Sequence, residues 1–452
     1  MTRSSRLTTD NPIEEVAAIV LAGGRGERLS PLTSACAKPA LPFGSAWKVI
    51  DFSLSNCVNS GIGRIGVATQ YQACSVAGHV RRAWNRTRRS RHPIELWDAA
   101  DYAPNGCYSG TADAVFRNLE NLRVHAPRLL LVLAGDHVYQ MDYRPMIEAH
   151  LRTRAAATIA CIEVPLAEAS RYGVLGTDAS LRIDSFAEKP ANPVPTVHSA
   201  DRAMISMGIY LFDFETIARE LQADALTEGS SHDFGHDVIP RLIHAHRVQA
   251  YRFHDTADEP CFWRDVGTLD VYYETNMTLL DPQPGFDPES AAWPIYSGRP
   301  HAKPVRFRAR PACSPGADSA DGDPAAPVTL EGMAIRSDLG AGCELAGGIV
   351  NHSVLAEGVH VDSGALVHNC VVLPEARIGA RSSIRNAIIA EGCQIPPGTR
   401  IGIDGLEDTL PCERTPGGIR IVTQAAVDRW LGTQSARTGA ARERSRRVAV
   451  AG

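Results

Sequence analysis

The feature that most constrains this chain is a six-residue apolar period in its C-terminal part. An Ile, Leu or Val recurs at every sixth position from 349 to 401, with two one-residue slips, and small or polar residues fill the gaps. Helices repeat every 3.6 residues and strands every two, so neither accounts for this period. The period predicts a parallel β-helix with stacked coils, although a chance series of short strands is the alternative. The residues predicted to point inward are Ile349, Leu355, Val361, Val367, Leu373, Ile378, Ile384, Ile389, Ile395 and Ile401.

The N-terminal part has a different pattern, in which apolar runs alternate with helical spacing. Residues 112–122 show helical spacing, and Thr111 could cap the start of that helix. Strands that alternate with helices predict an α/β domain with a parallel sheet, which binds ligands at the carboxyl ends of its strands. The predicted strands are 16–21, 65–69, 129–134 and 157–164.

At 452 residues the chain is long enough for two domains. A stretch rich in Pro, Gly, Ser and Asp separates the two patterns and is typical of a linker, while the basic, apolar-poor C-terminus is predicted to be disordered. The predicted segments are a flexible arm at 1–15, a catalytic domain at 16–280, a linker at 281–327, the β-helix at 328–432 and a tail at 433–452.

Charge and composition exclude several classes of function. Lys and Arg number 46 against 51 Asp and Glu, and the net charge of −5 argues against nucleic-acid binding. The first residues are too polar for a signal peptide, and no apolar run is long enough for a membrane span. Eleven cysteines without a C-x-x-C pair suit a reducing cytoplasm.

A glycine-rich loop directly follows the first predicted strand, in the stretch AAIVLAGGRGERLS at 17–30. The P-loop pattern is absent, and the dinucleotide pattern fails because Leu29 stands where a third glycine is required. Backbone amides beside Arg25, Arg28 and Lys38 would suit a triphosphate. The loop alone favours phosphate binding, and a tight turn with surface arginines is the alternative that stays open here.

Further motifs follow the loop in a family's order: AKPALPFG, VIDFSLSNCVNSGI, TQYQ, YSGTADAV, LAGDHVYQMDY, FAEKPANP, SMGIYLF, SHDFGHDVIPRL and FWRDVGTLD. From about 16 to 422 the chain resembles bacterial glucose-1-phosphate adenylyltransferases, also called ADP-glucose pyrophosphorylases. This resemblance implies a Rossmann-like nucleotidyltransferase domain followed by a left-handed β-helix. It also implies a cytoplasmic homotetramer of glycogen synthesis, with Mg²⁺ as cofactor, a small-molecule effector, and no nucleic-acid or membrane partner.

The implied reaction transfers the adenylyl group of ATP to α-D-glucose 1-phosphate and releases pyrophosphate. The nucleophile and the leaving group are both anions, so the site needs charge neutralisation and alignment rather than a nucleophilic side chain. The resemblance assigns catalysis to Asp136, Arg28 and Lys38, and the metal to Asp136 and Asp265. It assigns ATP to Leu21, Gly23, Gly24, Arg25, Gly26, Gln70, Tyr108, Gly110 and Thr111. It assigns glucose 1-phosphate to Tyr108, Gly173, Glu188, Lys189, Ser206 and Asp265.

The chain departs from this pattern at two places. Relatives activated by sugar bisphosphates carry Lys and Arg where this chain has Ala35 and Cys36, and an arginine where it has Gln424. Fewer cations predict a weak or different effector response. Cys107 replaces a common Trp, and the preceding segment lacks a PAQQR-like stretch, which puts catalytic strength in doubt.

Three alternatives follow from these observations. The glycine loop is shared with enzymes that use another base or sugar, such as thymidylyl- or uridylyltransferases. The altered segments suit a weakly catalytic regulatory paralogue in a mixed oligomer. Hexapeptide acyltransferases need a catalytic histidine in the β-helix, where His352, His360 and His368 lie, but no carrier-binding pattern accompanies these histidines.

Overall fold

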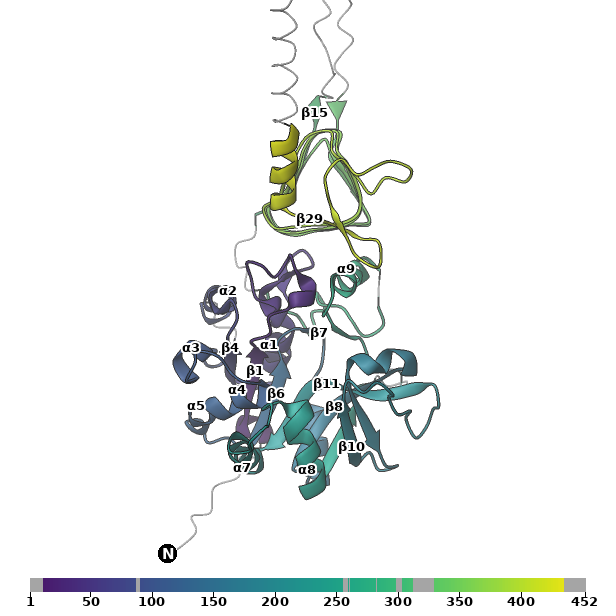
Figure 1. The fold of residues 1–452 in the computed structure, drawn as a ribbon. Coiled ribbons are helices and arrows are strands. Elements are labelled where there is room, and N and C mark those ends of the chain that lie inside the picture. The colour runs from purple at the N-terminus through teal and green to yellow at the C-terminus, as the bar shows by residue number, and fades with distance from the viewer. Residues whose placement is uncertain are drawn as a thin grey trace, which may run out of the picture.

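The computed structural model shows an α/β domain followed by a β-helix (Figure 1). Residues 11–15 of the predicted arm end in the 3-10 turn η1 (Pro12–Glu15), capped by the Asn11 side chain. The rest of the arm and most of the predicted tail lie outside the described residues. The described residues are 11–86, 90–254, 259, 261–281, 283–297, 303–311 and 329–434.

A nine-stranded sheet forms the centre of the α/β domain, with the strand order β10-β9-β11-β6-β1-β4-β5, and with β8 paired to β11 and β12 to β8. Strand β1 pairs in parallel with β4 and β6, and β11 runs antiparallel to β6, β8 and β9. The strands are β1 (Val16–Ala22), β4 (Arg64–Thr69), β5 (Glu95–Asp98), β6 (Leu129–Ala134), β8 (Ala157–Pro165), β9 (Gly173–Thr177), β10 (Ile183–Glu188), β11 (Arg202–Asp213) and β12 (Val248–Arg252).

Helices cover both faces of this sheet because its central strand is apolar on both faces. Val16, Ala18 and Val20 of β1 pack in the core with α1, α2 and α6, whereas Ala17 and Ile19 pack with α4, α5, α7 and α8. The helices are α1 (Ile50–Asn59), α2 (Ala73–His79), α3 (Ala99–Tyr102), α4 (Thr111–Arg117), α5 (Leu119–Arg123), α6 (Arg144–Thr153), α7 (Phe214–Ala225), α8 (Ile239–Ala245) and α9 (Leu269–Met277).

The helix predicted at 112–122 is two helices, α4 and α5, which meet at Asn118. The buried Asn118 amide donates to Ala114 O at 2.8 Å and to the Tyr108 hydroxyl at 3.0 Å, and such side-chain bonds compete with helix continuation. The predicted cap is also wrong. Gly110 is the N-cap residue of α4, and the Thr111 hydroxyl donates to Asp233 instead.

Of the segment predicted as a linker, residues 283–297 pack against the α/β domain, whereas residues 306–308 pair with 344–346 of the β-helix. Trp293 Nε1 donates to Asn56 Oδ1 at 2.9 Å, and Ile295 O accepts from Trp47 Nε1 at 2.8 Å. Phe286 is buried and stacks on Phe262 with ring centroids 4.1 Å apart. Residues 283–297 are therefore a packed strap beside α1.

The β-helix has parallel strands that pair with the strand one coil away, mostly seventeen residues along the chain, as in Leu366 with Ser383 and Ser383 with Arg400. The exception is β28, which pairs antiparallel with β29. A helix at 424–434 lies along it (Figure 1). Its strands are β14 (Arg306–Arg308), β17 (Met333–Ile335), β18 (Asp338–Leu339), β19 (Glu344–Ala346), β20 (Ile349–Asn351), β21 (Val354–Leu355), β22 (His360–Val361), β23 (Leu366–Val372), β24 (Arg377–Ile378), β25 (Ser383–Ile389), β26 (Gln394–Ile395), β27 (Arg400–Ile401), β28 (Glu413–Arg414) and β29 (Arg420–Val422).

Two residues predicted to point inward do not. Val350 and Val372 occupy the β-helix core, whereas Ile349 is half-buried and Leu373 packs toward the α/β domain. A seventeen-residue coil cannot hold three equal six-residue steps, so one step in each coil has five residues. The two slips in the sequence period are therefore part of the regular repeat. The other eight predicted residues belong to the β-helix core.

The two domains share a buried apolar cluster that includes Phe43 and Tyr272 of the first and Val371, Leu373 and Ile388 of the second. Hydrogen bonds at this contact include Tyr273 OH to Asn369 O at 2.8 Å and Ser45 N to an Asp338 carboxylate oxygen at 3.2 Å. Among the described residues, no helix is long and apolar enough to cross a membrane.

Candidate active site

The glycine loop opens a cleft at the carboxyl ends of β1, β4 and β6. Gly26 has a φ of 63°, and a Cβ there would lie 3.1 Å from Lys38 Cβ, so this position combines a left-handed backbone with close packing. A Cβ on Gly24 would meet open space. The larger cavity of the cleft, about 510 Å³, is lined by Leu21, Gly23, Gly24, Ala68, Gln70, Tyr108, Gly110, Thr111, Ala114, Ala134, Asp136, His137, Glu188, Lys189, Gly208, Tyr210, Asp233, Phe234 and Gly235.

A short pair of strands brings the two predicted metal-binding aspartates together. Strand β7 (His137–Tyr139) follows Asp136 and pairs antiparallel with β13 (Trp263–Asp265). The register places Asp265 opposite His137. Asp136 and Asp265 are thereby held beside each other although they are distant in the sequence.

Lys38 lies between the two aspartates. Its Nζ is 2.7 Å from Asp136 Oδ2 and 2.7 Å from Asp265 Oδ1. The Lys38 side chain is 8% exposed and the Asp136 and Asp265 side chains are 30% and 25% exposed, so water screens these charges less than it would screen a surface pair. The sequence predicted functions for all three residues, but it did not predict that they form one cluster.

The charges of this cluster stabilise one another. Burial lowers the pKa of Lys38, but the two carboxylates outweigh it and the net pKa is raised. Burial alone would raise the pKa of Asp136. The interactions with Lys38 and His137 outweigh the effect of burial and lower the pKa to about 2. Asp136 is therefore ionised at neutral pH and available as an oxygen ligand.

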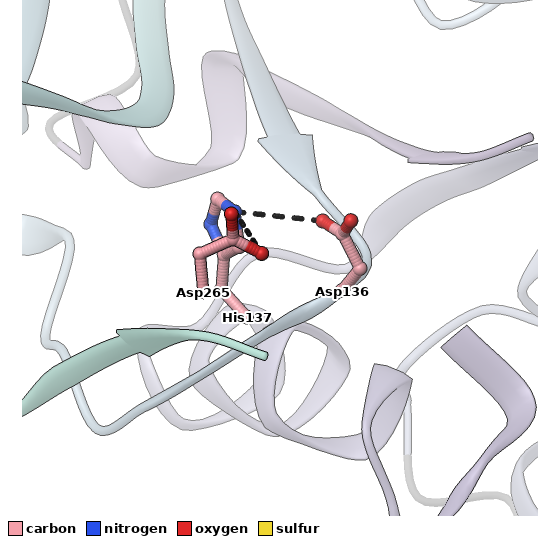
Figure 2. A group of neighbouring side chains, drawn as sticks. All are labelled: Asp136, His137 and Asp265. Carbon is pink, nitrogen blue, oxygen red and sulfur yellow. Dashed lines mark ion pairs between the residues drawn. The ribbon is translucent and has the colours of Figure 1, made fainter. Parts of the chain in front are cut away.

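His137 completes the cluster and was not predicted. The Nε2 atom of His137 lies 3.5 Å from Asp136 Oδ1 and 4.0 Å from Asp265 Oδ1, and Figure 2 shows the imidazole facing both carboxylates. One ligand atom from each residue lies within 4.8 Å of the others. The buried Nδ1 atom of His137 has no hydrogen-bond partner among the described residues. His137 stands inside the LAGDH motif, which was the available signal.

A smaller cavity of about 200 Å³ adjoins the larger one and shares five of its lining residues. Lys189 Nζ lies 2.6 Å from Glu188 Oε1, so these two predicted sugar-phosphate residues pair with each other here. A bulge in β11 between Ser206 and Tyr210 places Gly208 at the junction of the cavities. The smaller cavity is lined by Arg28, His137, Arg171, Tyr172, Gly173, Glu188, Lys189, Ser206, Gly208, Tyr210, Trp263, Asp265, Gly267, Thr268 and Val271.

Four predicted residues lie elsewhere than expected. Arg25 is exposed and its nearest carboxylate is Glu27, 3.8 Å away, and neither Arg25 nor Gly26 lines either cavity. Arg28 lines the smaller cavity beside Asp265 and not the larger one with the glycine loop. Tyr108, predicted for both substrates, lines only the larger cavity.

Local contacts explain the position of Tyr108. Its hydroxyl donates to Trp97 O at 3.2 Å and its backbone N–H donates to Gln70 Oε1 at 2.8 Å. Burial raises its pKa to about 12, so the phenol stays protonated. The ring therefore presents a fixed apolar face to the larger cavity.

Several cleft residues were missed although their motifs were recognised. Asp233 and Phe234 belong to SHDFG, Tyr210 to SMGIYLF and Trp263 to FWRDVGTLD. Phe234 packs on Tyr210 with ring centroids 5.6 Å apart. Only the folded chain shows which residue of each motif faces the cleft.

Comparison with known proteins agrees with this geometry. Residues 17–282 match the family described as nucleotidyl transferase, and residues 325–422 match the GlmU-like, C-terminal hexapeptide family. The glucose-1-phosphate adenylyltransferase of Albidiferax ferrireducens is 41% identical over 92% of this chain and 96% of its own length. Glucose-1-phosphate adenylyltransferase 2 of Alkalilimnicola ehrlichii is 42% identical over 93% of this chain and 94% of its own length. The glucose-1-phosphate adenylyltransferase of Methylococcus capsulatus is 41% identical over 94% of this chain and 96% of its own length. The chain belongs to the glucose-1-phosphate adenylyltransferase family.

Proposed function

We propose that this protein transfers the adenylyl group of ATP to α-D-glucose 1-phosphate and forms ADP-glucose and pyrophosphate. The observation that carries this proposal is the position of Asp136 and Asp265, which meet around Lys38 where the two cavities adjoin. Polyanions bound on the two sides of this cluster would have their reacting groups beside it. The relatives' printed names supply the substrates.

In this reaction a phosphate oxygen of glucose 1-phosphate forms a bond to the α-phosphorus of ATP. The bond from that phosphorus to the bridging oxygen of the β-phosphate breaks, and pyrophosphate leaves with the electron pair. No proton transfer is required, because nucleophile and leaving group are both ionised at neutral pH. The residues align the two substrates and offset their charge.

The residues divide this work by position. The glycine loop and the ring of Tyr108 line the larger cavity, which would hold ATP. Arg28 and Ser206 line the smaller one, which would hold the sugar phosphate. The Lys189 ammonium would exchange its Glu188 partner for phosphate, leaving Glu188 to accept from glucose hydroxyls.

We further propose Mg²⁺ as the cofactor, held by Asp136 and Asp265. The donor set fits, since Mg²⁺ prefers one or two carboxylates together with phosphate oxygens and water. When bound, the ion would neutralise phosphate charge and polarise the attacked phosphorus. Lys38 would keep both carboxylates in place. A homotetramer in the cytoplasm, with a small-molecule effector, completes the proposal.

The test is a product assay with the purified full chain, ATP, glucose 1-phosphate and Mg²⁺. We expect equimolar pyrophosphate and ADP-glucose, with other nucleoside triphosphates and sugar phosphates used far less well. Preference for UTP or dTTP would establish the other-nucleotide alternative. Absence of product with every nucleotide, unless a second catalytic subunit is added, would establish the regulatory alternative. Omitting Mg²⁺ in EDTA should abolish turnover.

A further inference from the structure

His232 of the SHDFG loop has a left-handed backbone conformation, and the roles proposed above for the site residues do not explain it. His232 has a φ of 55°, in the left-handed region, which few residues other than glycine occupy and in which asparagine, aspartate and histidine are the most frequent of them. The residue is half-buried and lies between α7 and the single-turn helix η6 (Phe234–Val238). Such strain persists only where surrounding contacts hold it, and it points to a functional constraint.

The contact that holds His232 is a buried carboxylate. His232 Nδ1 is 2.9 Å from Asp224 Oδ2, and the Asp224 side chain is 3% exposed. The other oxygen of Asp224 accepts from Ser230 Oγ at 2.9 Å and from Arg241 Nη1 at 3.4 Å. With both oxygens engaged, Asp224 fixes the direction of the imidazole.

The strained backbone of His232 supports the helix that lines the nucleotide side of the cleft. Its carbonyl oxygen accepts from Ala112 N at 2.9 Å and from Asp113 N at 3.3 Å. These are first-turn amides of α4, which have no partner inside the helix. The approach is so close that a Cβ on Gly110 would lie 2.2 Å from this oxygen.

The residues that follow His232 reach both substrate sides. Asp233 Oδ2 accepts from the Thr111 hydroxyl at 2.9 Å, and that hydroxyl accepts from Phe234 N at 3.0 Å. On the other side, a Cβ on Gly235 would lie 2.8 Å from Glu188 Oε2. One loop therefore contacts α4 on the ATP side and Glu188 on the sugar side.

We propose that His232 is a positioning residue of this enzyme. Anchored to Asp224, it holds the loop 230–235 in the one backbone conformation that fixes α4 relative to Glu188, and so aligns the two substrates. It does not touch the reacting atoms. This inference rests on the proposed function for its kinetic readout, and it carries its own binding readout.

Three substitutions separate the imidazole from the backbone. His232→Ala removes the anchor and disfavours the left-handed backbone. His232→Gly keeps the backbone accessible but removes the anchor. His232→Asn keeps both, because asparagine tolerates this conformation and can donate to Asp224. We expect the Ala and Gly variants to lose at least ten-fold in kcat/KM and to raise KM for both substrates, and the Asn variant to stay within three-fold of wild type.

Asp224 tests the anchor itself. We expect Asp224→Ala to match His232→Ala, and the double variant to be no more than two-fold worse than either single variant, because both changes remove the same interaction. The matched control is His246→Ala. His246 Nε2 also approaches a carboxylate of α7, Glu220 Oε1 at 3.3 Å, but His246 does not line the cleft. We expect its kinetic constants to stay within two-fold of wild type.

Equilibrium binding of ATP, measured by calorimetry without glucose 1-phosphate, repeats the comparison without turnover. We expect about ten-fold weaker binding in His232→Gly and near-normal binding in His232→Asn. Equal affinity and equal kinetic constants in wild type and His232→Gly would overturn the positioning role. Absence of ADP-glucose from the wild type would instead overturn the proposed function, and the binding series would still decide the role of His232.

Discussion

The active site and the β-helix differ in the sequence separation of their contacts and in whether those contacts repeat. In the site, Lys38 meets Asp136 and Asp265, which lie 98 and 227 residues away in the sequence, and each of these contacts occurs once. In the β-helix, contacts join residues about one coil apart and recur from coil to coil. The difference teaches where a substitution should act: on turnover in the site, and on stability in the β-helix.

The largest effect should come from removing one carboxylate charge in the site. We expect Asp136→Asn to lower kcat by roughly 10³-fold, about 4 kcal/mol, with a much smaller change in substrate affinity, because the lost charge neutralisation acts mainly in the transition state. Steady-state kinetics of pyrophosphate release, with saturating Mg²⁺, would measure the loss.

The matched control for Asp136→Asn is the same change in the β-helix. The Asp362 side chain is 27% exposed, close to the 30% of Asp136, and it also pairs with a basic group, His360 Nε2 at 2.9 Å. We expect Asp362→Asn to leave kcat within two-fold of wild type. Near-normal turnover in Asp136→Asn, or an equal loss in Asp362→Asn, would contradict the contrast between the two regions.

The next effect is on stability and uses two leucines of the β-helix. Leu355 is fully buried in its core, whereas Leu366 is 44% exposed on the outward face. We expect Leu355→Ala to cost about 3 kcal/mol of unfolding free energy and Leu366→Ala less than about 0.5 kcal/mol. Denaturant unfolding would measure both, and kcat of the folded fraction should not change in either variant. A lower kcat in Leu355→Ala would show that the β-helix shapes the site.

A smaller effect should appear in the pH dependence of stability, and it should arise from a buried histidine of the α/β domain. In α6, His150 is buried and its Nδ1 lies 2.8 Å from the Thr158 hydroxyl. Burial lowers its pKa from 6.5 to about 4. Between these values the unfolded imidazole binds a proton and the folded one does not, so stability falls as the pH drops from 6.5 toward 4. The loss is at most about 1.4 kcal/mol per pH unit and roughly 2–3 kcal/mol between pH 7 and pH 4.5.

His150→Gln cannot titrate at this position and should flatten that pH dependence in thermal unfolding between pH 7 and 4.5. His244 is exposed on α8, and His244→Gln is the control expected to keep the wild-type slope. The described histidines of the β-helix, at 352, 360 and 368, are all half-buried rather than buried. An unchanged slope in His150→Gln would show that other groups dominate acid destabilisation.

The contrast between the regions also explains what the sequence could predict. The apolar period in the sequence predicts the inward positions of the β-helix to within one residue, because the same packing recurs in every coil. Ile349 and Leu373 are each misplaced by one residue, next to a five-residue step. The runs that form β1 and β6 were equally visible, since a strand buried on both faces must be apolar throughout.

The site was predictable by residue and not by geometry. Motifs identified Asp136 and Asp265, but the pairing of β7 with β13 that joins them is a long-range contact with no local signal. His137 was missed because a single histidine after an aspartate has no periodicity to mark it. The Thr111 cap failed because its competitor, Asp233, is distant in the sequence.

The smallest expected effect is an effector response. The family resemblance implies cations for a sugar bisphosphate at three positions where this chain has Ala35, Cys36 and Gln424, and burial raises the pKa of the Cys36 thiol, so that position is neutral. The Gln424 side chain already accepts from Gln394 N at 2.7 Å. Each missing charge-assisted contact would have contributed about 1.5–3 kcal/mol to binding an anion. We therefore expect fructose 1,6-bisphosphate to change the initial rate less than two-fold, and the double variant A35K/Q424R to gain a larger, saturable activation. Strong activation of the wild type would mean that cations elsewhere in the chain bind the effector, and that these three positions do not decide it.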